Sequence, residues 1–186
     1  MDEKNKIPGV SFIKRNIGTI IGLILLVIIV SISTPKFLTS SNILNLLKSN
    51  SVNAIISCGM LLAILMGEID ISVGSTVGLS GIIGAYMITN VGLPVVPTVL
   101  ICLGVGALVG IVNGVAISYL KVPAFVATLA TQSIGRGLTE IISGGVTIRV
   151  RNTGYTALGN QNVAGISIII IYAAAVSYTH LRAHET

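Results

Sequence analysis

The sequence predicts an all-α, polytopic transmembrane helix bundle, with five helices and the start of a sixth in 186 residues. Two observations support this prediction. The chain is 53% hydrophobic and only 9% charged, with a mean hydropathy of +0.95, whereas a soluble domain carries about 25% charged residues. The apolar residues also form long runs that end at short polar or Gly- and Pro-containing breaks. Together these features place the chain in the membrane class.

Composition also argues against several functions. The formal net charge of +5 is spread over loops and ends, without a basic stripe, so no nucleic-acid partner is expected. The sequence has no Gly-Lys dipeptide and hence no Walker-type phosphate loop, so the chain is not expected to be an ATPase or other enzyme. Cys58 and Cys102 lie within apolar runs, which indicates buried side chains rather than disulfides. We expect no cofactor and no metal in this chain.

The first helix is expected at residues 17–33, after a polar cytoplasmic tail of residues 1–15. Pro35 follows it and prevents its continuation. The apolar run is longer than the 7–15-residue core of a secretory signal and ends in Ser-Thr-Pro-Lys, so it indicates an uncleaved membrane helix. Four basic residues precede this helix, which predicts a cytoplasmic N-terminus.

A second helix is expected from Asn42 to Met66, with N-cap residues at 39–42. A third follows from Val73 to Ile88 and is shorter than the ~20 residues needed to span a bilayer. Its small residues share one face, which favours close packing of two helices. A short helix beside a Gly-rich break also occurs at mid-membrane transport sites, and this alternative remains open. The residues of this face are Gly74, Gly78, Gly81 and Ala85.

The functional interpretation depends on the junction between these two helices, residues 67–75. It has the sequence Gly-Glu-Ile-Asp-Ile-Ser-Val-Gly-Ser. A carboxylate at bilayer depth costs about 2.5–3.5 kcal/mol on insertion scales. Glu68 and Asp70 therefore place the junction at a membrane face or in a break lined by protein. Capping of the third helix by Asp70 or Ser72 explains the polar residues, and it is compatible with a functional role.

Two further helices are expected at residues 95–120 and 124–142, with an exterior turn before the first and a cytoplasmic turn at Lys121–Pro123 between them. Asn113 is the one amide in the first of these helices. It is expected to form an interhelical hydrogen bond, with a place on the substrate path as the alternative. In the second, a polar residue recurs at every fourth position, which places all four on one face. These residues are Thr128, Gln132, Arg136 and Glu140.

An arginine in a spanning helix should face water or the bundle interior and should have a partner. Glu140 is the candidate partner in the same helix, and Glu68 and Asp70 are candidates from the junction. A structural ion pair explains the polar stripe. The alternative is that the stripe lines a translocation pathway, where hydroxyls, amides and charges bind a polar solute.

The remaining chain contains a long polar segment, residues 143–165, which helix counting places outside. It is either a solvated loop or a docking surface. A sixth helix begins at 166–175, and residues 176–186 then turn polar. This end resembles the in-frame translation of a transposase-type sequencing-library adaptor, so its two histidines are not expected to bind metal. We therefore expect an incomplete transmembrane permease domain at 16–175 and a non-native tail at 176–186.

The junction resembles the Gly-x-Ile-Asp-Leu-Ser-Val-Gly-Ser signature of the ribose/xylose-type sugar ABC transporter permeases. Residues 134–138, Ile-Gly-Arg-Gly-Leu, and 143–145, Ser-Gly-Gly, resemble a later segment of that family. The resemblance covers residues 42–148 and implies the membrane-spanning permease subunit of an ATP-binding-cassette importer. The signature and coupling candidates are Gly67, Glu68, Asp70, Ser72 and Gly74. The translocation-path candidates are Asn113, Thr128, Gln132, Arg136 and Glu140.

The resemblance also implies partners and a location. A second permease subunit would form a homodimer, a cytoplasmic ATPase would bind ATP and Mg, and an extracytoplasmic binding protein would deliver the sugar. The location would be the bacterial inner membrane, and the chain would be an N-terminal fragment that is inactive by itself. Alternatives are a same-superfamily permease for branched-chain amino acids, nucleosides or a furanosyl signal and, more distantly, an ion-coupled secondary transporter or channel. Neighbouring genes for an ABC ATPase and a sugar-binding protein would favour the importer.

Overall fold

The computed structural model describes residues 15–163 and 165–183. The chain divides into two compact units, Met1–Leu47 and Lys48–Thr186. The described residues are almost entirely helical, with one short two-stranded sheet, which confirms the all-α prediction. Among them, two helices are long and apolar enough to cross a membrane by length and composition: α3 (Ser40–Leu65) and α5 (Val95–Ser118).

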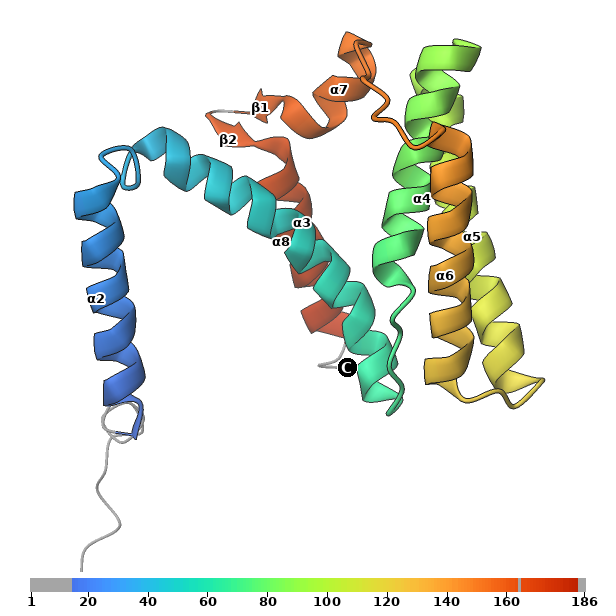
Figure 1. Cartoon of the computed structure of the whole chain (residues 1–186), viewed down its shortest axis with the longest axis horizontal. Coiled ribbons are helices and arrows are strands. Elements are labelled where there is room, and N and C mark those ends of the chain that lie inside the picture. Colours follow the sequence, from blue (N-terminus) through green and yellow to red (C-terminus); the bar gives the residue numbers. More distant parts are fainter. Residues whose placement is uncertain (1–14, 164, 184–186) are drawn as a thin grey trace, which may run out of the picture. The chain divides into compact units, whose positions relative to one another are not determined.

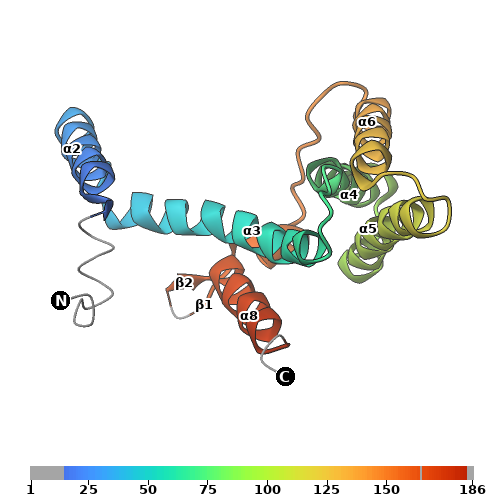
Figure 2. The ribbon, with the colours of Figure 1, turned by 90° about the horizontal axis from the view of Figure 1, so that it is seen from below.

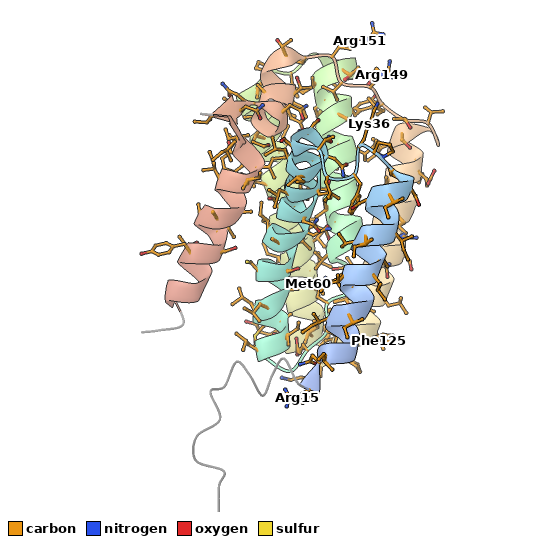
Figure 3. All side chains as sticks on the ribbon, turned by 90° about the vertical axis from the view of Figure 1, so that its left-hand side faces the viewer. Arg15, Lys36, Met60, Phe125, Arg149 and Arg151 are labelled. Carbon is orange, nitrogen blue, oxygen red and sulfur yellow. The ribbon has the colours of Figure 1, made fainter. Side chains whose placement is uncertain are left out.

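The first unit contains α2 (Ile17–Ser33) and the start of α3. Arg15 and Lys36 lie at opposite ends of α2 (Figure 3). None of the residues of α2 is buried, and its sequence is apolar on all sides, as expected of a helix that contacts lipid. The predicted N-cap of α3 is confirmed, because the Thr39 hydroxyl accepts a hydrogen bond from the Asn42 N–H at 3.4 Å.

The junction after α3 is a helix end, as predicted. Gly67 has φ +76°, the left-handed conformation that glycine adopts without a steric penalty. Its N–H donates to the Ile64 carbonyl at 2.9 Å, and the Glu68 N–H donates to the Ala63 carbonyl at 3.0 Å. This pair of bonds is the Schellman motif, which satisfies carbonyls that the end of a helix leaves free. The glycine of the signature motif therefore has a structural explanation.

The core of the second unit is three helices that lie side by side: α4 (Val73–Tyr86), α5 and α6 (Ala124–Ser143) (Figures 1 and 2). A π-helix, η1 (Met87–Val91), extends α4. The predicted short third helix is thus 14 residues of α4 plus 5 of η1, or 19 in total, close to the ~20 that span a bilayer. α4 packs against both of the other helices, and Leu79 of α4, Ile88 of η1 and Ala127 of α6 are buried.

Close helix packing occurs at different glycines from those predicted. A Cβ added at Gly74, Gly78 or Gly81 would have no other atom within 4 Å. By contrast, a Cβ at Gly135 of α6 would lie 3.1 Å from the Ser75 Oγ of α4. The helices α4 and α6 therefore approach through Gly135 and Ser75, whereas Gly74, Gly78 and Gly81 line open space.

The polar segment after α6 is more ordered than predicted. It contains a helix, α7 (Thr153–Asn160), whose N-cap residue Asn152 accepts the Tyr155 N–H at 3.0 Å. Two short antiparallel strands follow, β1 (Asn162–Val163) and β2 (Ile166–Ser167). The last helix, α8 (Ile168–Ala183), continues past the predicted end at residue 175.

The extension of α8 has a simple physical explanation. Residues 176–183 contain neither Gly nor Pro, and other polar residues lower helix propensity by well under ~1 kcal/mol each. Helicity therefore does not test the adaptor-like origin of residues 176–186, which stays a prediction. His184 lies outside the described residues.

Candidate functional site

The first turn of α4 is held by a chain of hydrogen bonds that starts at Asp70. The Asp70 carboxylate accepts from the Ser72 N–H at 2.8 Å and from the Ser72 hydroxyl at 2.6 Å. The Asn113 amide of α5 donates to the Ser72 Oγ at 2.9 Å. The Thr131 hydroxyl of α6 donates to the Asn113 Oδ1. We call these four residues the junction network, because they connect the junction with α4, α5 and α6.

The junction network satisfies polar groups that are inaccessible to solvent. Ser72 is 1% exposed and Asn113 is 6% exposed. In lipid, an unsatisfied polar group costs several kcal/mol, so such groups need partners inside the protein. The predicted interhelical bond of Asn113 is confirmed by these contacts. Capping is confirmed for Asp70, whose side chain bonds Ser72, whereas the Ser72 side chain makes no capping bond.

A polar recess of about 370 Å³ lies between α4 and α6. Gly74 and Gly78 leave one wall without side chains, so the space opposite the polar face of α6 stays open. The recess brings together three of the four residues of the predicted stripe. The residues that line it are Gly74, Ser75, Gly78, Gln132, Arg136, Thr139 and Glu140.

Thr128 and Asn113 lie outside this recess. Thr128 is 1% exposed, and its hydroxyl donates to the Ala124 carbonyl of its own helix at 2.8 Å. It also lies 3.4 Å from the Ile69 carbonyl of the junction. The first turn of α6 therefore packs against the junction, and the stripe opens to the recess only one turn later.

Arg136 forms no ion pair or side-chain hydrogen bond with any residue that the structure describes. The predicted partner Glu140 lies one turn away on the same face, but both side chains are exposed and line the recess. Asp70 bonds Ser72 instead. The hydrogen-bonding groups of Arg136 and Glu140 therefore face the recess without a partner from the described part of the chain.

The recess combines all the hydrogen-bonding types that a polar neutral solute requires. A guanidinium donates only, a carboxylate accepts only, and amide and hydroxyl groups do both. Charged partners roughly double the strength of a hydrogen bond. A second hollow of about 480 Å³, between α4, α5 and α6, is lined mainly by aliphatic side chains, with the hydroxyls of Ser75, Thr76 and Thr131 but no charged or amide side chain. The polar recess is therefore the candidate site.

Sequence reasoning missed Thr139 and Thr131. Thr139 lies seven residues after Gln132 and three after Arg136, so helical spacing places it on the same face. A search for all polar positions at spacings of three, four and seven would have found it. Thr131 has no such signal, because its partner Asn113 comes from another helix.

Comparison with known proteins identifies the family. A family model described as branched-chain amino acid transport system / permease component matches residues 42–183. The chain belongs to this permease family. This confirms the resemblance to transport permeases that the junction motif predicted.

Curated relatives of this permease chain include sugar importers. It is 40% identical over 157 residues to the ribose import permease protein RbsC of Haemophilus influenzae, covering 81% of this chain and 47% of that protein. It is 40% identical over 158 residues to RbsC of Bacillus subtilis, covering 84% and 49%. It is 34% identical over 137 residues to the xylose transport system permease protein XylH of Escherichia coli K12, covering 74% and 35%. The chain thus spans about half or less of the length of these relatives. No solved structure matches it.

Proposed function

We propose that this permease chain belongs to the translocation subunit of an ATP-binding-cassette importer for a ribose- or xylose-like sugar. The observation that supports this most strongly is the 40% identity to ribose import permeases over 81% of the chain. The family description names branched-chain amino acids, but the similar curated relatives cited above are named for ribose and xylose. These names favour a pentose as the solute.

The polar recess supplies chemistry for such a solute. A sugar that leaves water must exchange its hydrogen bonds for bonds to protein, or each lost bond costs free energy. Arg136 would donate to sugar oxygens and Glu140 would accept from sugar hydroxyls. Gln132 would do both. The bare wall at Gly74 and Gly78 would let the ring approach the backbone of α4 closely.

We propose that the chain is a multi-pass inner-membrane protein with a cytoplasmic N-terminus. Basic residues before the first helix favour this orientation. In the second unit, Arg149 and Arg151 lie at the end opposite Phe125, the second residue of α6 (Figure 3). Counting helices from a cytoplasmic N-terminus puts Phe125 at the cytoplasmic end and the two arginines outside.

This orientation assigns the partners to opposite ends. A cytoplasmic ATPase that binds ATP and Mg would contact the chain at the junction near Glu68 and Asp70 or at the turn near Lys121. A binding protein would dock outside, on the segment that contains α7. A second permease subunit, in a homodimer, would complete the translocation pathway. ATP hydrolysis would belong to the ATPase.

A chimera tests the proposal. The region of the H. influenzae ribose permease that matches this chain is replaced by the matching segment, and the chimera is expressed in cells that lack their own ribose permease but retain its ATPase and binding protein. We expect uptake of labelled ribose that requires both partners. Uptake of leucine with no uptake of ribose, or uptake that is abolished by a protonophore but independent of the ATPase, would contradict the proposal.

A further inference from the structure

The side chain of Tyr155 packs α7 against α4 and α5. A Cβ added at Gly84 of α4 would overlap the Tyr155 hydroxyl oxygen and would lie 2.8 Å from the Cys102 Sγ of α5. The Cys102 thiol in turn donates to the Ser80 carbonyl of α4 at 3.3 Å. The phenol of Tyr155 therefore occupies a notch that exists because residue 84 has no side chain. We call this the Gly84 notch.

Two helices form the Gly84 notch, so it depends on how they pack. Gly84 is buried, whereas Gly81 on the same helix is exposed and would have no atom within 4 Å of an added Cβ. If α4 shifted or rotated against α5, the side chain of Ile83 or Ala85 would replace Gly84 opposite Cys102, and the phenol would be expelled. Packed helix interfaces move between discrete arrangements rather than deforming continuously, which makes the notch either present or absent.

α7 also packs against α8. Its described side-chain bonds to other elements include one between Lys48 of α3 and Asn160. A cavity of about 550 Å³ adjoins α7 and is lined by Val99, Leu103 and Tyr172 as well as by Tyr155. The phenol therefore has space to enter when it leaves the notch. Tyr155 is the side chain that connects α7 with the interface between α4 and α5.

We infer that Tyr155 is a positioning residue that couples the position of α7 to the packing of α4 against α5. The inference rests on the proposed function, in which α7 faces the exterior and Gly74 of α4 borders the solute recess. Gly84 and Gly74 are ten residues apart on one continuous helix, about 15 Å at 1.5 Å per residue. A partner that displaces α7 would thereby alter the packing of the helix that forms one wall of the recess.

Thiol labelling tests the coupling without a transport assay. The background variant Cys58→Ser leaves Cys102 as the only cysteine, and the rate of its alkylation by N-ethylmaleimide is measured on the purified chain in lipid nanodiscs. We expect Tyr155→Ala to increase the rate about tenfold, which corresponds to an opening made easier by about 1.4 kcal/mol. Gly84→Ala should have the same effect, because its methyl group displaces the phenol.

Two controls separate coupling from general destabilisation. Gly81→Ala places the same methyl group three residues earlier on α4, in open space, and should leave the labelling rate unchanged. Adding Tyr155→Phe to Gly84→Ala removes the overlapping hydroxyl and should lower the rate again. An unchanged rate in Tyr155→Ala, or equal rates in Gly81→Ala and Gly84→Ala, would overturn the inference. Since Tyr155→Ala creates no overlap, it decides the matter even if Gly84→Ala fails to fold.

A transport measurement then connects the notch with the proposed function. In the chimera with its ATPase and binding protein, Gly84→Ala should raise the concentration of binding protein at half-maximal uptake severalfold, and Gly81→Ala should not. If Tyr155→Ala increases the alkylation rate of Cys102 but the chimera transports no sugar, the proposed function is refuted and the coupling at the Gly84 notch is not. If Tyr155→Ala leaves the rate unchanged while the chimera transports ribose, only the coupling at the notch is refuted.

Discussion

We expect the replacement of Asn113 by leucine to destabilise the folded chain, whereas hydropathy alone predicts that it stabilises the chain. On insertion scales, leucine is favourable in a membrane helix by a few tenths of a kcal/mol, so a polar-to-apolar change in the middle of a chain of this composition should stabilise it. Asn113, however, bonds Ser72 and Thr131 across two helix interfaces. We therefore expect Asn113→Leu to destabilise the packing of α4, α5 and α6.

The loss of stability in Asn113→Leu depends on which hydrogen bonds Ser72 and Thr131 keep. Interhelical hydrogen bonds in membrane proteins contribute about 0.6 kcal/mol on average and at most about 1.7 kcal/mol. After the change, the Ser72 hydroxyl still donates to Asp70 and the Thr131 hydroxyl still reaches the Ala127 carbonyl at 3.0 Å. No hydroxyl proton is left without an acceptor, so the loss should be about 1–2 kcal/mol for the two bonds. Asn113→Asp should cost more, because it adds a second carboxylate, at about 2.5–3.5 kcal/mol in a helix centre.

The assay is equilibrium unfolding of the purified chain in mixed detergent micelles, followed by loss of helicity. A double-mutant cycle of Asn113→Leu with Ser72→Ala isolates the bond between these two residues. The control cycle pairs Asn113→Leu with Ser133→Ala, because the one partner of the Ser133 hydroxyl among the described residues is the Leu129 carbonyl of its own helix. That control pair should show no coupling energy.

Two results would refute the reasoning. One is an Asn113→Leu variant as stable as the unmodified chain, since hydropathy would then outweigh the junction network. The other is a coupling energy between Asn113 and Ser72 below about 0.5 kcal/mol, the range in which independent substitutions add.

Three further predictions concern packing, the recess and the notch. Gly135→Ala should lower the free energy of unfolding by about 1–3 kcal/mol, as overpacking does, because the new carbon would lie 3.1 Å from the Ser75 Oγ. Gly137→Ala adds the same carbon in open space and should leave stability unchanged. Equal effects of the two substitutions in the unfolding assay would contradict the close packing at Gly135. Arg136→Ala should lower ribose uptake by the chimera about tenfold without changing its assembly, because a hydrogen bond to a charged group, worth about 1.5–3 kcal/mol, is lost. Ser133→Ala on the same helix should leave uptake unchanged. Full uptake in Arg136→Ala would show that the recess is not part of the pathway. Burial, reinforced by the neighbouring Cys102 thiol, raises the pKa of Tyr155 above its ordinary value of 10.0. Neutral Tyr155 therefore stabilises the packing of α7 below pH 10, and this contribution is lost as the pH rises through the raised pKa. The tyrosinate absorbance that Tyr155→Phe removes should titrate above pH 10.

The membrane helices could be predicted from sequence because their signals are local. Apolar runs ended by Pro35, by Gly67 or by the turn at Lys121–Pro123 place most helix ends within a few residues of those in the structure. Capping of α4 by a polar residue of the junction was also predicted, because Asp and Ser side chains accept the first free N–H groups of a helix, but the choice between Asp70 and Ser72 was left open.

Features that depend on tertiary contacts could not be predicted in this way. α7 is eight residues long and contains two glycines, so its helicity depends on the Asn152 cap and on the seat of Tyr155 rather than on propensity. Sequence spacing grouped the glycines of α4 by face but could not show that a partner helix approaches Gly84 and leaves Gly74 and Gly78 open. Spacing likewise brought Arg136 within reach of Glu140, but reach does not determine which way two long side chains turn.

The polar face of α6 has a consequence for biogenesis. α6 has 20 residues, long enough to span, but it is not apolar enough to count as a membrane span by composition, whereas α5, which leaves the ribosome just before it, is. A helix that carries Gln132, Arg136 and Glu140 partitions poorly into lipid by itself, because each such group is costly there. Its insertion should therefore wait at the translocon until α4 and α5 provide a protein surface, so the three helices would enter the bilayer as one cooperative step.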